Sequence, residues 1–449
     1  MTAEELQHAV PAPVRRVATR LEDAGYEAWA VGGAVRDVLL GRPGGDWDLA
    51  TAARPDEVRR LFRRTVPIGI EHGTVGVLEG GVLYEVTTFR RDVETFGRHA
   101  VVEFADTIDE DLSRRDFTCN ALAWRPATGE LRDPFHGRED LEQGRLRTVG
   151  EAVDRFAEDY LRILRALRFA GQFELRIVPD TWRALRAAVG ELRGLSAERV
   201  REELWKVLGR ARAASHSLSL YADAGVLNVL YPELAAVHAL DDGPDRVRPW
   251  DRSLGAVDAL PPKRTLLRAA ALLHAIGMPA ARTKDLRGGW RYTGHEVLGA
   301  RKAGDVMARL KASNADTQRL TRLVGHQRDL FPPDAPDAGV RRWLRHVGAD
   351  LVRDLFRLRF ALWRGANEAA RPDDLLERWH MAHTVLRSRP ALDVTDLAIG
   401  GHELRELGME PGPRFGEILD ELLERVTEDP SLNERTALLE LVRSELIGP

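Results

Sequence analysis

Residues 27–49 read EAWAVGGAVRDVLLGRPGGDWDL, and this stretch decides the fold of the amino-terminal part of the chain. The short apolar run Glu27–Val31 predicts a strand, which a Gly-Gly pair follows directly. Ala34–Leu40 has helical spacing and stops at a glycine, which is typical of a helix end. Asp46–Ala50 predicts another strand. The alternation of strand and helix indicates a head of mixed α and β structure.

The rest of residues 1–150 continues this mixture. Thr74–Leu78 and Val82–Phe89 alternate like the two arms of a hairpin. Further helices are predicted at Val14–Ala24 and Pro55–Phe62, and further strands at Val101–Phe104 and Ala121–Arg125.

From about residue 151 the strand signals fade and helical spacing dominates. Asp154–Gln172 predicts one long amphipathic helix, and Thr181–Val189 and Ala197–Leu208 predict two more. We therefore expect an α+β fold in which a small mixed β-sheet head is followed by a long all-α arm. The expected domains are a head (1–150), a helical neck (151–215), a helical body (216–390) and a helical tail (391–449).

Composition restricts the class of protein. The 449 residues are 44% hydrophobic and 30% charged, which is typical of a globular chain and excludes a disordered one. The only cysteine, Cys119, cannot form an internal disulfide. No stretch is long and apolar enough for a membrane-spanning helix, and the first residues lack an apolar signal core. We expect a cytoplasmic protein without a membrane partner.

Charge is unevenly distributed around the net value of −4. Residues 341–364 hold seven arginines and two aspartates, whereas residues 401–449 hold twelve acidic residues and five arginines. The basic stretch also carries aromatic residues at helical spacing. It is interpreted as a core stripe of aromatics combined with a basic face that contacts RNA phosphates.

The first candidate site is the glycine turn together with the DWD run. Gly32 and Gly33 between a strand and a helix allow backbone N–H groups to approach a phosphate. Asp46 and Asp48 are two residues apart, so on a strand they share a face and could bind two Mg²⁺ ions for phosphoryl transfer. An exposed turn rich in Asp and Gly is the alternative. Glu85, on the predicted strand 82–89, is either a third carboxylate at the metal or a solvated strand residue.

Two further runs carry opposite charges close together. Arg114, Arg115 and Asp116 could clasp a ribose hydroxyl and a phosphate, or form a surface ion pair. Cys119 lies in the same run without an evident base and is interpreted as a small buried side chain. On the predicted helix 154–172, Asp159 and Arg162 are neighbours that could present an acceptor and a donor to the edge of a base, with Arg165 on the same face. A helix stabilised by ion pairs is the alternative.

Taken together, these runs resemble class II tRNA nucleotidyltransferases, the CCA-adding family of the polymerase-β superfamily, whose relatives include bacterial poly(A) polymerases. The resemblance is strong over residues 25–215 and weak to residue 419. The matching motifs are GGAVRDVLLG with DWDL (32–49), RRDFTCNA (114–121), DPFHG (133–137), EDYLRILRALRF (158–169) and LSAERVREEL (195–204).

The resemblance implies a role for each matching residue. Asp46 and Asp48 would hold the catalytic Mg²⁺ ions, Asp159 and Arg162 would pair with the incoming base, and Arg165 would help to hold phosphates. The residues that would surround the triphosphate are Gly32, Gly33 and Arg36, and those around the ribose are Arg114, Arg115, Asp116 and Asn120. Residues 90–104 fall where the family has a flexible loop that is needed for switching to ATP, and residues 133–137 match its hinge motif.

One segment departs from longer members of the family, which carry an HD phosphohydrolase domain. Residues 272–278, with His295 and His326, resemble a remnant of that domain, but Ala275 stands where the HD pair would need an aspartate. We therefore expect these histidines to be packed or surface residues and the domain to serve as a scaffold for RNA.

The implied function is template-independent addition of nucleotides from CTP and ATP to the 3′ end of tRNA by two-metal phosphoryl transfer. Recognition of the acceptor and TΨC arms by shape suits such a protein. An enzyme that adds only CC or only the final A stays open as an alternative, and a poly(A) polymerase is a further one. A pure RNA-binding module would need no paired metal carboxylates.

Overall fold

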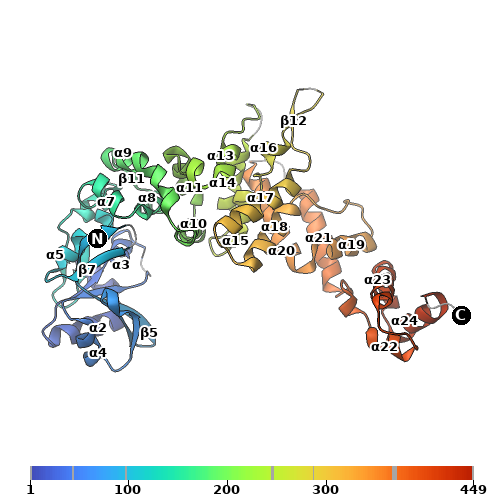
Figure 1. Ribbon diagram of the computed structural model, residues 1–449, viewed down its shortest axis with the longest axis horizontal. Helices are drawn as coiled ribbons and strands as arrows, with labels where there is room; N and C mark the ends of the chain where they lie inside the picture. Colours follow the sequence, from blue (N-terminus) through green and yellow to red (C-terminus); the bar gives the residue numbers. More distant parts are fainter. Residues whose placement is uncertain are drawn as a thin grey trace. The chain divides into compact units, whose positions relative to one another are not determined.

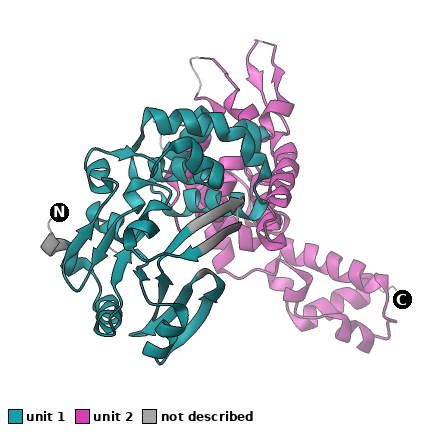
Figure 2. Cartoon of the chain, turned by 60° about the vertical axis from the view of Figure 1, so that its left-hand side comes forward, with its two compact units in different colours: residues 1–232 teal, residues 233–449 magenta. Residues whose placement is uncertain are grey.

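The computed structural model describes residues 3–42, 45–96, 99–243, 247–286, 288–366 and 372–446. The chain divides into two units, Met1–Pro232 and Glu233–Pro449, which are coloured teal and magenta in Figure 2. The finer division into head, neck, body and tail stays a prediction.

A seven-stranded mixed sheet forms the centre of the head, with the strand order β3-β4-β5-β2-β1-β8-β9. Only β2 and β5 run parallel, and every other neighbouring pair in this sheet is antiparallel. Figure 1 shows these strands in blue and cyan. They are β1 (Ala28–Val31), β2 (Asp48–Thr51), β3 (Thr65–Gly69), β4 (Thr74–Glu79), β5 (Val82–Thr88), β8 (Ala123–Arg125) and β9 (Glu130–Arg132).

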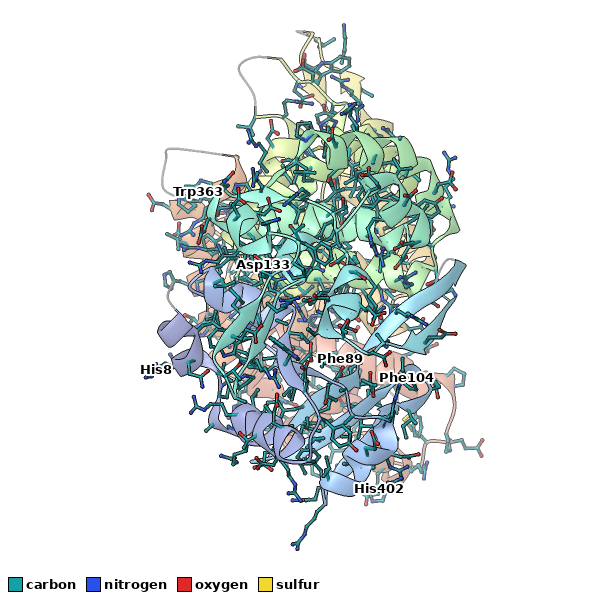
Figure 3. All side chains as sticks on the ribbon, turned by 90° about the vertical axis from the view of Figure 1, so that its left-hand side faces the viewer. His8, Phe89, Phe104, Asp133, Trp363 and His402 are labelled. Atoms are coloured by element: carbon teal, nitrogen blue, oxygen red, sulfur yellow. The ribbon has the colours of Figure 1, made fainter. Side chains whose placement is uncertain are left out.

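The predicted hairpin is confirmed as β4 and β5, and its alternation follows from one face being buried. Along β5, Tyr84 and Val86 are buried whereas Glu85 is exposed. Phe89, which is labelled in Figure 3, follows β5 and is fully buried in a core cluster with Trp29 and other apolar residues of the head. Burial of such side chains supplies most of the stability of a sheet of this kind.

Two head elements differ from the sequence predictions. Strand β3 was not predicted, because its central side chains are exposed and show no apolar alternation. Residues 90–104, which the resemblance matches to a flexible loop, form an antiparallel hairpin of β6 (Arg90–Phe96) and β7 (His99–Phe104), apart from the main sheet, and β7 contains the predicted strand Val101–Phe104. Residues 97 and 98 of that segment lie outside the described residues.

The helices of the first unit follow mainly after the sheet. They are α1 (Ala3–Ala9), α2 (Ala12–Asp23), α3 (Gly33–Leu39), α4 (Pro55–Leu61), α5 (Ile108–Ser113), α6 (Gly137–Glu142), α7 (Ala152–Glu158), α8 (Leu161–Phe173), α9 (Pro179–Ala188), α10 (Ala197–Arg210), α11 (Ala214–Ala224) and α12 (Val226–Leu230). A short parallel pair, β10 (Arg145–Leu146) and β11 (Arg176–Ile177), accompanies them.

The prediction of one helix over 154–172 is wrong, because the helix breaks between α7 and α8. At the break Asp159 is extended, with φ −157° and ψ 105°. Its Oδ1 accepts a hydrogen bond of 3.0 Å from the backbone N–H of Leu161. An aspartate that binds the N–H two residues ahead competes with a continuous helix and starts a new one.

The second unit is helical, with one short antiparallel pair, β12 (Thr283–Lys284) and β13 (Trp290–Arg291). Its helices are α13 (Pro232–His238), α14 (Pro249–Ala259), α15 (Thr265–Leu273), α16 (Met278–Ala281), α17 (His295–Arg309), α18 (Asn314–Gly325), α19 (Asp337–Val347), α20 (Ala349–Gly365), α21 (Asp373–Arg387), α22 (Gly401–Glu406), α23 (Pro413–Glu428) and α24 (Arg435–Leu441). No helix within the described residues is long and apolar enough to cross a membrane.

The basic stretch 341–364 is only partly the predicted solvated face. Its aromatic residues pack as expected, with Trp343 and Phe356 buried. However, Arg341 donates to the carbonyl oxygens of Thr427 and Glu428 at the end of α23, at 2.6 and 2.9 Å. Arg345 pairs with Glu424 at 2.8 Å. Part of the basic stretch therefore binds the acidic carboxyl-terminal segment, and these arginines are not free for RNA.

Candidate active site

A cavity of about 670 Å³ lies within the first unit, between the sheet and helices α8 and α10. It brings together residues that the sequence places up to 179 positions apart, from Val31 to Arg210. Every site residue predicted from the sequence lines this cavity except Asp46. The three motifs therefore form one site.

The carboxylates come together because β2 and β5 are parallel neighbours. Asp48 begins β2, and the register pairs Leu49 with Val86, which places Glu85 beside Asp48. Burial, and next the negative charge of Glu85, raise the pKa of Asp48 to about 6, and Asp46 adds to the effect. Asp46 is exposed and precedes the strand, so its negative charge acts from the edge of the site.

These oxygen ligands fit a divalent metal. Mg²⁺ prefers carboxylate oxygens and retains several waters, which suits a site open to solvent on one side. A carboxylate whose charge is disfavoured by burial and by like charges is stabilised when a cation joins it. Asp46, Asp48 and Glu85 are thus the residues that could hold the metal.

The glycine turn is shaped by a close approach. Gly32 has a positive φ of 72°, and a Cβ at this position would lie 2.7 Å from Nη1 of Arg115. Its N–H donates to the carbonyl of Leu122 at 3.2 Å. The turn therefore lets the arginine lie against the backbone, while Gly33 begins α3 at the cavity wall.

A chain of hydrogen bonds links the motifs along the cavity wall. Arg36 donates to Oδ1 of Asn120, whose amide donates to Asp116 at 2.9 Å. Asp116 also pairs with Arg165 of α8 at 2.6 Å. Burial would raise the pKa of Asp116, but the charge of Arg165 and the hydrogen bond from Asn120 hold it below its ordinary value.

This chain changes the interpretation of Arg36. Arg36 is only 6% exposed, its guanidinium also binds Asp37, and it lies 4.3 Å from the centre of the Phe173 ring. Most of its donors are engaged by protein groups. Arg36 therefore holds Asn120 in place more than it offers donors to a triphosphate.

Arg114 and Arg115 follow α5 and share one carboxylate. Asp111 is buried and accepts from Nη2 of Arg115 at 3.1 Å, and it lies 3.5 Å from Nε of Arg114. Both arginines remain partly exposed at the cavity wall. Asp111 therefore orients both arginines at the cavity wall.

Asp159 and Arg162 do not bind each other, so the alternative of an ion pair between them is not what the structure shows. Oδ2 of Asp159 binds Arg199 of α10 at 2.6 Å. Arg162 pairs with Glu158 and donates to the carbonyl oxygens of Arg155 and Arg114, at 2.9 and 3.4 Å. Because the helix breaks at Asp159, the two side chains are held by different partners. Both residues still line the cavity, and they contribute an acceptor and a donor to its wall.

Helix α10 supplies cavity residues that the sequence analysis missed. Arg199, Lys206 and Arg210 line the cavity at spacings of seven and four residues along one face of the helix. Buried Glu203, between them, pairs with Arg168 of α8 at 2.7 Å and with Lys206 at 2.9 Å. The basic spacing within residues 197–210 was the signal that could have found this face.

The predicted hinge run 133–137 leads into α6, which packs against the 114–120 run of the site. Asp133, labelled in Figure 3, accepts from the N–H groups of Gly137 and Arg138 at the start of α6. A Cβ on Gly137 would lie 2.1 Å from the carbonyl oxygen of Thr118, so only glycine lets α6 pack under the 114–120 run. Cys119 in that run is buried, as predicted, and burial raises its pKa to about 12.

His274 of the 272–278 segment and His295 lie in the second unit and are packed, as predicted. His274 and His295 are each 3% exposed, and Ala275 is fully buried. His326 is half-buried. Together with Asp329 and His346 it forms a group whose nitrogen and carboxylate oxygen atoms lie within 4.8 Å of one another, close enough to hold a metal ion.

Comparison with known proteins agrees with this arrangement. Residues 28–147 match the family model described as the poly A polymerase head domain. Residues 174–237 match the model described as a probable RNA and SrmB binding site of polymerase A.

Curated relatives extend the similarity to nearly the full chain. A CCA-adding enzyme of Geobacillus stearothermophilus is 36% identical over 420 residues, which cover 93% of this chain and 92% of the relative. One of Levilactobacillus brevis is 33% identical over 95% of this chain and 96% of its own length. A third, of Leuconostoc mesenteroides, is 48% identical over 216 residues, or 48% of this chain and 53% of the relative.

Solved structures show the same fold. The crystal structure of the Bacillus stearothermophilus CCA-adding enzyme in complex with CTP has a TM-score of 0.75 and 30% identity, and covers 97% of this chain and 99% of that one. The Thermotoga maritima CCA-adding enzyme complexed with tRNA has a TM-score of 0.56 at 20% identity, over 98% of both chains, which shows similarity of fold alone.

Proposed function

This chain belongs to the family of CCA-adding enzymes, and we propose from this that the cavity around Asp48 adds C and A nucleotides to the 3′ end of tRNA. The observation that carries the proposal is the union, in one cavity, of the carboxylates on β2 and β5 with the arginines and Asp159 of the following segments. The reaction is the transfer of a nucleotide from CTP or ATP to the terminal hydroxyl of tRNA, with release of pyrophosphate.

Asp46, Asp48 and Glu85 hold divalent metal in this proposal, with Mg²⁺ as the ion. When bound, a pair of Mg²⁺ ions supplies charge neutralisation to the attacking and leaving oxygens of a phosphoryl transfer. The support is the closeness of the carboxylates and the raised pKa of Asp48. No protein nucleophile is needed, and Cys119, buried with a pKa raised to about 12, is unsuited to that role.

The cations of the cavity bind the triphosphate. Arg114 and Arg115, oriented by Asp111, offer paired N–H donors suited to phosphate oxygens. Lys206 and Arg210 of α10 extend the basic wall. Arg165 is shared between Asp116 and the cavity, so it acts on a phosphate while it remains paired.

The ribose and the base occupy the polar groups between these cations. Asp116 and Asn120 are fixed by Arg165 and Arg36 and lie where ribose hydroxyls would be recognised. Asp159 offers only acceptors and Arg162 only donors. Cytosine and adenine each carry an exocyclic amine beside a ring nitrogen acceptor, so the two side chains match both bases without a nucleic-acid template.

Addition of CCA to the tRNA, and not of CC or A alone, follows from the relatives. This protein matches CCA-adding enzymes over almost their whole length. We place recognition of the tRNA acceptor and TΨC arms, by shape, on the helical part of the chain. A tRNA substrate and a single buried cysteine suit a cytoplasmic enzyme.

The experiment that tests this function uses tRNAs that lack one, two or three terminal residues, each incubated with one nucleoside triphosphate at a time. We expect CTP to extend the tRNAs that lack two or three residues and ATP to extend the tRNA that lacks one. Extension by CTP alone would show a CC-adding enzyme, and a long A tail on every substrate would show a poly(A) polymerase. Either of these results contradicts the proposal.

A further inference from the structure

A second cavity, of about 590 Å³, lies within the second unit and is not used by the reaction proposed above. Its wall comes from α14, the segment from His274 to α16, the start of α17, the turn after α18, α20 and the start of α21. A cavity of this size is in the range of small-molecule binding sites.

Three arginines from different elements line this cavity: Arg252, Arg328 and Arg359. Arg359 is half-buried, and its Nε has no hydrogen-bond partner among the described residues. Burial, and next the charges of Arg378 and Arg328, lower the pKa of Arg359 to about 10. The positive charges therefore repel one another across the cavity, and an anion bound there would stabilise them.

The acidic residues of the wall do not cancel this charge. Asp373 and Asp374 also line the cavity, at the start of α21. Asp374 pairs with Arg378, one turn further along the helix. The wall therefore carries three arginines and two aspartates, a net positive charge.

His274 adds a hydrogen-bond acceptor to the wall. Its ring is 3% exposed, and Nδ1 lies 2.9 Å from the carbonyl oxygen of Ala271. Burial, and next the charge of Arg252, lower the pKa of His274 to about 3, so the ring is neutral. In a neutral ring whose Nδ1–H donates to Ala271, Nε2 is an acceptor. Nε2 is buried without a partner among the described residues, so a ligand hydroxyl or amine would satisfy it.

The remaining wall is apolar and includes a flat ring. Met278, Leu362 and Leu375 line it, together with Trp363, which is half-buried and labelled in Figure 3. An indole face offers stacking area to a planar ring of a ligand.

We propose that this cavity binds a nucleoside phosphate as a second, non-catalytic nucleotide site. The phosphate suits the three arginines, a ribose hydroxyl suits Nε2 of His274, and the base suits Trp363. The cavity has no metal-binding HD pair, because buried Ala275 follows His274. The ligand is therefore bound and not hydrolysed.

Isothermal titration calorimetry of the full-length protein with AMP tests this inference, with adenosine and inorganic phosphate as partial ligands. We expect each partial ligand to bind at least about tenfold more weakly than AMP, because each lacks a charge-assisted or stacking contact. Since the head cavity also takes nucleotides, the decisive variants are in the second unit. R328Q and R359Q should each weaken AMP binding at least about tenfold.

Arg364→Gln is the matched control, because Arg364 is an exposed residue of α20 that does not line the cavity. Arg328 is also exposed, so its substitution leaves packing intact, and the thermal unfolding midpoint of each variant verifies this. Unchanged AMP affinity in both R328Q and R359Q would overturn the proposal, as would inorganic phosphate binding as tightly as AMP. If R328Q weakens tRNA binding but AMP does not bind, the wall is an RNA contact and the proposal is wrong.

Discussion

Replacing Asp159 by asparagine tests the base-reading role in the head cavity, because the substitution keeps the shape and exchanges one acceptor oxygen for a donor. In the structure Oδ1 accepts from the N–H of Leu161 at 3.0 Å and Oδ2 accepts from Arg199 at 2.6 Å. If the amide oxygen faces Arg199, the NH₂ group meets the N–H of Leu161. If the amide is flipped, the NH₂ group meets Arg199. One donor is left unmatched in either orientation, and the cavity gains a donor where cytosine and adenine present an amine.

An unmatched polar group of this kind costs about 1–3 kcal/mol, which corresponds to about 5- to 150-fold in kcat/KM. We expect Asp159→Asn to lower kcat/KM for CTP and ATP by at least about tenfold. UTP and GTP, which present a carbonyl at that edge, should lose less, so that selectivity falls. The assay is steady-state incorporation of each of the four nucleotides into tRNA that lacks the terminal residues.

Glu151→Gln is the control for this variant, because Glu151 is an exposed carboxylate ahead of α7 and does not line the cavity. Its kinetics should match those of the unmodified protein. If Asp159→Asn slows all four nucleotides by the same factor, the selectivity ratio is unchanged and the reasoning is refuted. Asp159 would then only fix Arg199 and the start of α8.

Three further substitutions test the scaffold around the two cavities. Arg165→Gln removes the partner of buried Asp116 and should lower the free energy of unfolding of the head by about 3–5 kcal/mol. Urea unfolding measures this loss, with the exposed residue Arg176→Gln as the control. A loss equal to that of the control would contradict the buried pair. Gly137→Ala should lower the free energy of unfolding by about 1–3 kcal/mol or more, because the added Cβ overlaps the Thr118 carbonyl. Gly190→Ala is the control, because a Cβ there meets open space. Equal unfolding midpoints for the two variants would be evidence against this packing. The pKa of His274 is lowered to about 3, so between that value and about 6.5 the unfolded chain binds a proton that the folded chain does not. Stability should therefore decline as pH falls below about 6.5, and the urea midpoint of His274→Gln should change less between about pH 7 and 5 than that of the unmodified protein; parallel pH profiles would show that His274 is not responsible.

The sequence predicted most of the head because its motifs are contiguous. The Gly-Gly turn, the DWD run and the hairpin were each recognisable from local patterns, and the structure places residues of all three in one cavity. That β2 pairs in parallel with β5 could not be read from alternation, since both orientations show the same pattern. The sequence therefore left Glu85 as either a metal ligand or a solvated strand residue. The strand register, which places Glu85 beside Asp48, favours the metal ligand.

The errors concern partners that tertiary structure decides. Asp159 and Arg162 were expected to be neighbours on one continuous helix, but a side-chain hydrogen bond to the backbone broke the helix, and the two side chains bind Arg199 and Glu158 respectively. Likewise, residues 341–364 were interpreted as a core stripe of aromatics with a basic face for RNA phosphates, and the structure shows that two of the basic residues, Arg341 and Arg345, instead bind α23, about 80 residues away in the sequence. Local spacing identifies charged residues, whereas packing selects which opposite charge each one meets.

The most direct test of the central claim is the rate of CMP incorporation into tRNA lacking its three terminal residues, measured with Asp48→Asn at saturating Mg²⁺. Asp56→Asn, an exposed aspartate of α4 in the same head, is the matched control. We predict that Asp48→Asn lowers the rate by at least about a thousandfold, while tRNA affinity stays within about threefold, because Asp48 acts on the reacting phosphate and not on the RNA. A rate near that of the Asp56→Asn control, or a loss of tRNA binding as large as the loss of turnover, would contradict the assignment of Asp48 to the catalytic metal site.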